Sequence, residues 1–146
     1  MSYYDAMLKR PAFSTAILCV FSGLLICSIR CSAQHMNAKD GPCQAPATGA
    51  KETACFDAAS KKSDAELNRI YLQIETIVAG DELVKLKAAQ RLWIQFRDAN
   101  CDAEHELYSG GSAAPMVRLA CVEAMTRHRT EELKVMYGWR LAKFSK

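Results

Sequence analysis

The chain has 146 residues, a length that suits one domain with a modest hydrophobic core. Its 19 lysine and arginine residues and 16 acidic residues leave a net charge of only +3. This balance argues against a nucleic-acid-binding protein, which would show a one-signed basic face. The sequence contains neither a glycine-rich phosphate loop nor an internal repeat.

Residues 1–33 have the pattern of an export signal. Lys9 and Arg10 precede an uncharged stretch, 12–29, that is rich in Leu, Ile, Val and Phe. Small residues then lead up to Ala33, so we predict cleavage after Ala33 and a mature protein that begins at the next residue. The alternative is an uncleaved membrane anchor, because about 18 to 20 apolar residues can just span a bilayer. Serine, threonine and glycine dilute this stretch, which favours removal of the leader.

The seven cysteines divide between the leader and the rest of the chain. Three of them lie in the leader, and four follow it: Cys43, Cys55, Cys101 and Cys121. An even set of thiols in an exported protein tends to oxidise. The sequence therefore predicts two disulfides.

After the leader, residues 34–48 predict an extended lead-in, because they are polar and contain Gly and Pro. The main domain is expected over residues 49–146. Its first helix is predicted from Thr48, as N-cap, to Val78, with apolar residues at three- and four-residue steps. Those residues are Phe56, Leu67, Ile70, Tyr71, Ile74, Ile77 and Val78.

Gly80 ends this pattern, and we expect Asp81 to cap a second helix. That helix carries Leu83, Leu86, Trp93, Phe96 and Leu107 at compatible spacing. Residues 108–114 predict a flexible connector, and Pro115 suits the first turn of a third helix that extends to about Phe144. No segment shows sustained period-two alternation. We therefore predict an all-α fold, a small up-down-up bundle of three main helices held by two disulfides.

Four cysteines allow three pairings, and helix geometry favours one of them. Cys101 lies seven residues before Tyr108, and Cys121 lies six residues after Pro115. At a rise of about 1.5 Å per residue, both cysteines are roughly 10 Å from the connector on adjacent helices. We therefore predict Cys101–Cys121 and, with it, Cys43–Cys55 between the lead-in and the first helix.

A metal site is the competing interpretation of these cysteines. Cys101 and His105 are four residues apart and share a helix face. Zinc ordinarily takes three or four protein ligands, and the oxidising location disfavours free thiolates. We expect no metal and no cofactor.

Three blocks of sequence, taken in order, resemble a known family. The first is 64–71, with Leu67, Asn68 and Tyr71, and the second is 89–101, with Gln90, Trp93, Phe96, Arg97 and Cys101. The third runs from Tyr108 to Ser112 and is followed by Cys121, Thr126, Arg129 and Leu133. Together they resemble the LprI-type lysozyme-inhibitor domain over nearly all of 43–137. The resemblance implies an exported helical protein and, for some members, inhibition of lysozyme, but no inhibitory residue is carried over from it.

We expect structural roles for several residues of these three blocks. Trp93 and Phe96 are expected in the core, where truncation of either would cost about 3–5 kcal/mol. Arg97 and Arg129 are expected to pair with a carboxylate at the helix interface (Asp98, Asp64 or Glu123) rather than with an anionic partner. Asn68 and Gln90 are expected to form hydrogen bonds between helices.

Two features remain as candidate contact surfaces. Asp98, Asp102 and Glu106 form a row at four-residue steps. Paired carboxylates can hydrolyse glycosides, but an open helix face supplies no cleft, so we expect no enzyme. The row suits docking of a strongly cationic protein such as lysozyme. The connector, with Tyr108, Gly110, Gly111 and Ser112, is either an ordinary helix–helix loop or a segment that enters a narrow cleft.

The leading hypothesis is an exported protein that blocks lysozyme or another cell-wall lytic enzyme. The alternative is a structural, interaction or immunity-type module of the envelope that binds a different protein. No nucleic-acid partner is expected, and contact with a membrane is expected only through an uncleaved leader. The sequence leaves the oligomeric state open.

Overall fold

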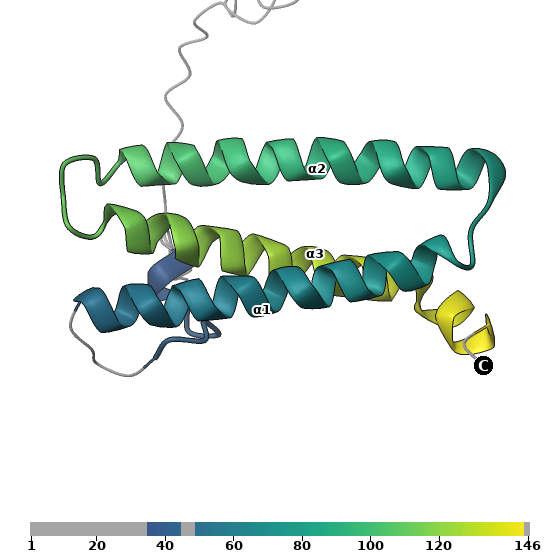
Figure 1. Cartoon of the computed structure of the whole chain (residues 1–146), viewed down its shortest axis with the longest axis horizontal. Helices are drawn as coiled ribbons and strands as arrows, with labels where there is room; N and C mark the ends of the chain where they lie inside the picture. The colour runs from purple at the N-terminus through teal and green to yellow at the C-terminus, as the bar shows by residue number, and fades with distance from the viewer. Residues whose placement is uncertain (1–34, 45–48, 145–146) are drawn as a thin grey trace, which may run out of the picture. The chain divides into compact units, whose positions relative to one another are not determined.

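The computed structural model describes residues 35–44 and 49–144, so the predicted leader and Thr48 lie outside the described residues. Four elements follow one another in the described part: the short 3-10 helix η1 (His35–Asn37) and three long helices. These are α1 (Gly49–Glu75), α2 (Gly80–Glu106) and α3 (Ala114–Phe144). The described residues contain no strand, and the helices run up, down and up (Figure 1). The predicted all-α fold is confirmed.

Local sequence explains where the helices begin. Gly80 has φ +56°, a left-handed conformation that favours glycine, and it stands at the sharp turn between α1 and α2. The N-cap of α2 is Ala79, and no side chain caps it. The prediction that Asp81 is the cap is therefore wrong. Asp81 lies in the first turn instead, where its negative charge complements the positive end of the helix dipole. Pro115 lies in the first turn of α3, as predicted.

The third helix is the centre of the bundle. It packs against both α1 and α2 and also contacts η1 (Figure 1). The largest buried cluster unites all three helices near the turn between α1 and α2; it consists of Leu67, Ile70, Ile74, Val78, Leu86 and Leu133. Trp93 and Tyr71 are partly buried against this cluster. Buried apolar area of this kind is what holds three amphipathic helices together.

A second cluster lies near the other end of the bundle. Phe56 of α1 is fully buried against Met116 and Ala120 of α3. Cys43 and Met36 of the lead-in pack over this cluster. The lead-in therefore covers the beginning of α1 and of α3 rather than extending freely.

Phe96 contradicts its prediction, because its side chain is 61% exposed. Trp93, three residues earlier, faces the core and is partly buried. Three residues turn an α-helix by about 60° short of a full circle, which carries Phe96 away from α3. Only one face of α2 is covered, so Phe96 stays in solvent.

Among the described residues, no helix is both long enough and apolar enough to cross a bilayer.

Candidate functional site

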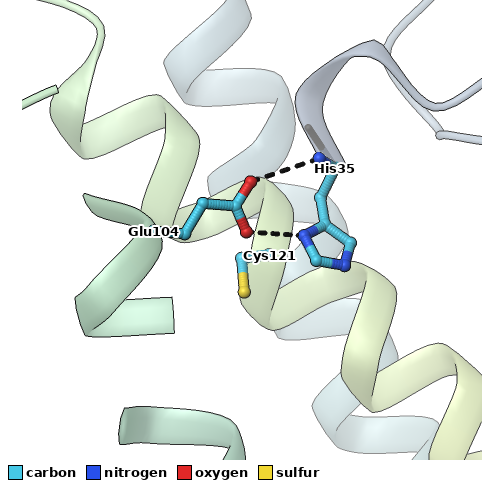
Figure 2. Close-up of side chains that lie close together, drawn as sticks. All are labelled: His35, Glu104 and Cys121. Carbon is cyan, nitrogen blue, oxygen red and sulfur yellow. Dashed lines mark hydrogen bonds and ion pairs between the residues drawn. The ribbon is translucent and has the colours of Figure 1, made fainter. Parts of the chain in front are cut away.

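The lead-in is anchored to α2 by one histidine and one carboxylate. The Nδ1 atom of His35 lies 2.6 Å from Oε2 of Glu104, and the backbone N–H of His35 donates to Oε1 at 3.3 Å (Figure 2). The side chain of Glu104 is only 10% exposed. This contact was missed in the sequence, because the two residues are 69 positions apart and neither belongs to a recognisable motif.

The same place brings together three groups that bind metals in other proteins. Ligand atoms of His35, Glu104 and Cys121 lie within 4.8 Å of one another (Figure 2). The sulfur of Cys121, however, is bonded to Cys101, and a disulfide sulfur is not a thiolate ligand. Two ligands then remain, which are too few for a protein zinc site. The Cys101–His105 pair weighed in the sequence loses its thiolate for the same reason.

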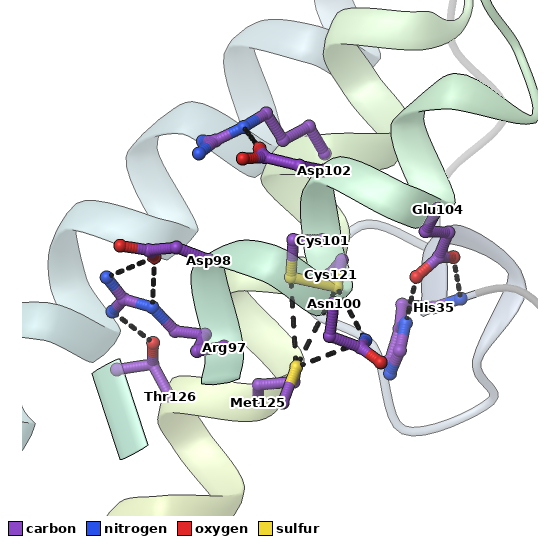
Figure 3. Close-up of a disulfide and its surroundings, with 11 residues drawn as sticks. His35, Arg97, Asp98, Asn100, Cys101, Asp102, Glu104, Cys121, Met125 and Thr126 are labelled. Carbon is purple, nitrogen blue, oxygen red and sulfur yellow. Dashed lines mark hydrogen bonds and ion pairs between the residues drawn. A yellow bond between two sulfur atoms is a disulfide. The ribbon is translucent and has the colours of Figure 1, made fainter. Parts of the chain in front are cut away.

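Behind this contact, the Cys101–Cys121 disulfide joins α2 to α3. Both cysteines are fully buried, with 5.5 Å between their Cα atoms. The sulfur of Met125 lies 3.8 Å from Cys101 and 3.9 Å from Cys121 (Figure 3). The amide of Asn100 donates to the sulfur of Met125 at 3.5 Å. The Cys101–Cys121 disulfide is therefore buried between the two helices, next to the sulfur of Met125.

The second disulfide, Cys43–Cys55, ties the lead-in to α1 with 6.1 Å between the Cα atoms. Cys55 is exposed and Cys43 half-buried. Both pairs match the pairing predicted from helix geometry. Cys43–Cys55 and the His35–Glu104 contact fix the lead-in at separate points on α1 and α2.

The connector between α2 and α3 is more ordered than its composition predicts. Hydrogen-bonded turns run through it, among them Tyr108 N–H to His105 O at 3.0 Å and Gly111 N–H to Tyr108 O at 2.9 Å. Gly110 has φ +79°, which favours glycine at this position. Gly110, Gly111 and Ser112 are exposed, while Tyr108 is half-buried. The result is a compact, exposed tip rather than the flexible connector expected.

The acidic row on α2 is partly neutralised. Asp98 accepts a hydrogen bond from Arg97 at 3.0 Å, and Asp102 accepts one from Arg118 of α3 at 2.8 Å. The carboxylate of Glu106 lies 3.8 Å from Nδ1 of His105. Glu106 and Asp102 remain well exposed. The row therefore keeps acidic groups in solvent close to the connector. Arg97 and Arg118 offset part of the negative charge of its three carboxylates.

A stack of charged and aromatic side chains joins the three helices farther along. Arg97 of α2 donates to Asp64 of α1 at 3.0 Å and to the hydroxyl of Thr126 of α3 at 3.1 Å (Figure 3 labels Arg97 and Thr126). The Arg97 guanidinium also lies 5.4 Å from the centre of the Trp93 ring, and the guanidinium of Arg129 lies 5.7 Å from the same ring. Such pairs are favourable when partly desolvated. This stack joins the three helices. Both of its arginines, Arg97 and Arg129, already pair with carboxylates of the protein.

The remaining motif residues divide between buried and exposed positions. Gln90 is buried and accepts a hydrogen bond from Arg129 of α3 at 3.3 Å. Arg129 pairs with Glu132 rather than with any of the three carboxylates predicted for it. Asn68 is exposed on α1, and within the described residues no hydrogen bond joins it to another helix, so that expectation is wrong. Burial, with Glu75 nearby, raises the pKa of Tyr71.

One buried carboxylate on α3 has a structural role. Glu123 is almost fully buried and accepts hydrogen bonds from Ser63 and from Arg127, both at 3.1 Å. Arg127 also donates to Asp40 of the lead-in at 2.9 Å. These groups border a half-open cavity of about 270 Å³ between the lead-in, α1 and α3. Glu123, Arg127 and Asp40 are therefore paired with one another, and among the described residues no buried side-chain polar atom lacks a hydrogen-bond partner.

Comparison with known families decides what kind of protein this is. The model of the lysozyme inhibitor LprI family matches residues 43–133. The chain belongs to the LprI family. The LprI match includes both disulfides, the acidic row and the connector, and it ends within α3. The family is one of inhibitors rather than enzymes.

A protein of Rhizobium meliloti (strain 1021), described as uncharacterized, is 33% identical to this LprI chain over 124 residues. The alignment covers 76% of this chain and 87% of the relative. No solved structure matches the chain.

Proposed function

We propose that this LprI-family protein is an exported inhibitor of a cell-wall lytic enzyme, with lysozyme as the first candidate. The observation that carries the proposal is the family match over 43–133, which includes all of α2, the connector and the first two thirds of α3. Inhibition would be steric, with the exposed tip of the connector entering the substrate cleft of the enzyme.

The order of the connector supports this mechanism. Its turns are hydrogen-bonded, and the buried Cys101–Cys121 bond fixes the two helices from which it emerges. A loop that is already ordered loses little conformational entropy on binding, so more of its contact energy appears as affinity. The exposed Gly110 and Gly111 keep the tip narrow, and Tyr108 at its base supplies an aromatic group for the rim of the contact.

The acidic row contributes to the rate of encounter. Asp102 and Glu106 are exposed within two helical turns of the connector. Lysozyme is strongly cationic, and opposite charges on two proteins raise the association rate at low salt. Arg118 offsets part of the charge of Asp102, so steering and not tight binding is the role that we assign to the row.

Export fits the oxidised cysteines. Disulfides form and persist outside the reducing cytoplasm, and a pattern typical of a signal peptide precedes the domain. We therefore place the mature protein in the periplasm or outside the cell.

Titration of lysozyme with the purified exported protein tests the proposal. Lysis of bacterial cell walls should slow in proportion to the amount of protein added and stop near equimolar amounts. The variant Ser112→Trp adds bulk at the tip and should weaken inhibition. Ala79→Trp is its matched control, because Ala79 is exposed at the opposite end of α2. This variant should inhibit like the parent protein.

No slowing of lysis, together with no complex on a sizing column, would reject lysozyme as the target. Affinity capture from envelope extracts would then ask which protein binds. Recovery of another lytic enzyme would keep the inhibitor proposal, whereas specific recovery of an unrelated protein or toxin would favour an immunity-type module.

A further inference from the structure

The second helix carries an apolar surface that the domain itself leaves uncovered. We call it the outer stripe of α2 and define it by residues that follow one face of the helix; they are Val84, Ala88, Leu92, Phe96, Ala99, Ala103 and Leu107. The four large side chains, Val84, Leu92, Phe96 and Leu107, are between 61% and 80% exposed. A run of large exposed apolar groups along one face usually marks a contact surface.

The outer stripe lies away from the core face of α2. Leu86, Gln90 and Cys101 mark the buried face, which packs on α3. At about 100° per residue, the centre of the stripe is roughly 160° around the helix from those residues. Figure 1 shows α1 and α3 on the same side of α2. Within the described residues no other element covers the stripe.

The outer stripe stays largely apolar in both directions from its centre. Counted outward from the point between Gln95 and Phe96, Phe96 corresponds to Gln95, Leu92 to Ala99 and Ala88 to Ala103. At the two ends, Val84 corresponds to Leu107. On either side of the central Phe96 and Gln95, a large apolar residue thus meets a small one, and apolar residues meet at both ends. Two such helices laid side by side in opposite directions present matching surfaces to each other.

One pair of opposite charges follows the same symmetry, while the exposed Asp81 and Asp102 lie within the width of the stripe without charged counterparts. Lys85 and Glu106 are equally far from the centre, and both lie within the width of the stripe. Lys85, Leu92, Ala99 and Glu106 are separated by steps of seven residues, the repeat that keeps side chains on one seam of paired helices. In an antiparallel pair, Lys85 would meet Glu106 of the partner subunit at each end. In a parallel pair, like charges would face each other.

We propose that the outer stripe is the contact between two copies of this chain, which pair through antiparallel α2 helices about a two-fold axis near Gln95 and Phe96. The self-complementary order of size and charge favours a second copy over a partner of different sequence, because a foreign partner would not require the symmetry. The pair would carry its two connectors at opposite ends. Glu106 would belong both to this contact and to the acidic row, so only the tip of the connector is separable from self-association.

Sedimentation equilibrium of the purified exported protein tests the pairing. The parent protein should have the mass of two chains, and Phe96→Glu should shift it to one chain, with dimerisation weakened at least about tenfold. Val135→Glu is the matched control, because Val135 is 82% exposed on α3, outside the stripe, and the variant should remain a dimer. Circular dichroism should show that both variants keep their helix content, since both positions are exposed.

A charge exchange tests the antiparallel register. Lys85→Glu and Glu106→Lys should each weaken the dimer, and the double variant should restore it, because each new glutamate again meets a lysine of the partner. A parent protein that stays a single chain at about 100 μM, far above the range of specific dimers, would overturn the proposal. A monomer whose Phe96→Glu variant loses affinity for the lytic enzyme would also overturn it and would assign the stripe to that enzyme. Failure of the double variant to restore the dimer would overturn the register.

Discussion

Glu104 near the end of α2 binds both the ring and the backbone of His35, which lies 69 residues earlier in the chain. The carboxylate is nearly buried, and its partner belongs to the short helix that opens the described structure. With Cys43 bonded to Cys55 of α1 and Asp40 paired with Arg127 of α3, the lead-in is held at three points on three different helices. The lead-in is therefore an integral part of the domain.

Removal of this carboxylate should release the start of the lead-in. We expect Glu104→Ala to raise the rate of amide hydrogen exchange in residues 35–37 and to lower the free energy of unfolding by about 1–3 kcal/mol, since a hydrogen bond to a charged group is lost. Glu106→Ala is the matched control, because Glu106 is exposed and two residues away. Unchanged exchange in Glu104→Ala would show that the disulfide and the Asp40–Arg127 pair hold the segment without this carboxylate.

The two disulfides should differ in what their removal costs. Each closes a short loop, of sequence separation 20 for Cys101–Cys121 and 12 for Cys43–Cys55. The chain-entropy model gives about 3 kcal/mol for loops of this size. Replacement of both Cys101 and Cys121 by Ala should cost more than this, because it also leaves a cavity in a fully buried layer. Urea unfolding of the two double variants measures the difference, and an equal loss would contradict the buried position of Cys101–Cys121.

Arg97 should be the most costly arginine to replace. It connects all three helices through Asp64 and Thr126 and lies against the ring of Trp93. Arg97→Ala should lower the free energy of unfolding by about 2–3 kcal/mol, and Arg97→Lys should recover little of it, since lysine lacks the planar fork. Arg118→Ala, which removes an exposed pair with Asp102, should cost less than about 1 kcal/mol. Similar losses at both positions in thermal or urea unfolding would count against the stack.

Glu66 should titrate at unusually low pH. Hydrogen bonds from Arg69, with Lys134 nearby, lower the pKa of Glu66 from 4.5 to about 2. A lowered pKa means that the ionised form is favoured in the folded state, so the stabilisation is complete above pH 4.5 and is lost as the pH falls toward 2. The contribution is small, because the pair is well exposed and screened by salt. Carboxyl titration by NMR should find the low pKa, and an ordinary value in low salt would contradict these pairs.

Much of the fold was readable from the sequence because local signals agree with one another. The turn at Gly80, Pro115 in the first turn of α3 and the spacing of apolar residues in α1 each act within a few residues. The pairing of Cys101 with Cys121 followed from helix rise alone, because both lie at equal distances from one connector. These are short-range constraints that one sequence contains.

Contacts between distant segments were not readable. The apolar spacing of α2 fits two stripes, and only the position of α3 decides that Trp93 turns inward and Phe96 outward. His35 and Glu104 carry no common motif, and Arg129 finds Glu132 and Gln90 rather than the carboxylates predicted for it. Asn68 lies in a family block and yet is exposed. The position of the connector could therefore be predicted from the sequence, but the charge pairs around it required the packed helices.

Intact mass spectrometry of the exported protein, alkylated with and without prior reduction, tests most directly whether two disulfides hold this LprI-family domain. We predict the mass of a chain that begins at Gln34, with no alkyl group added before reduction. After reduction, four alkyl groups should be added, one at each of Cys43, Cys55, Cys101 and Cys121. Alkylation of all four cysteines without reductant would contradict the disulfide-held domain and the inhibitor mechanism built on its ordered connector.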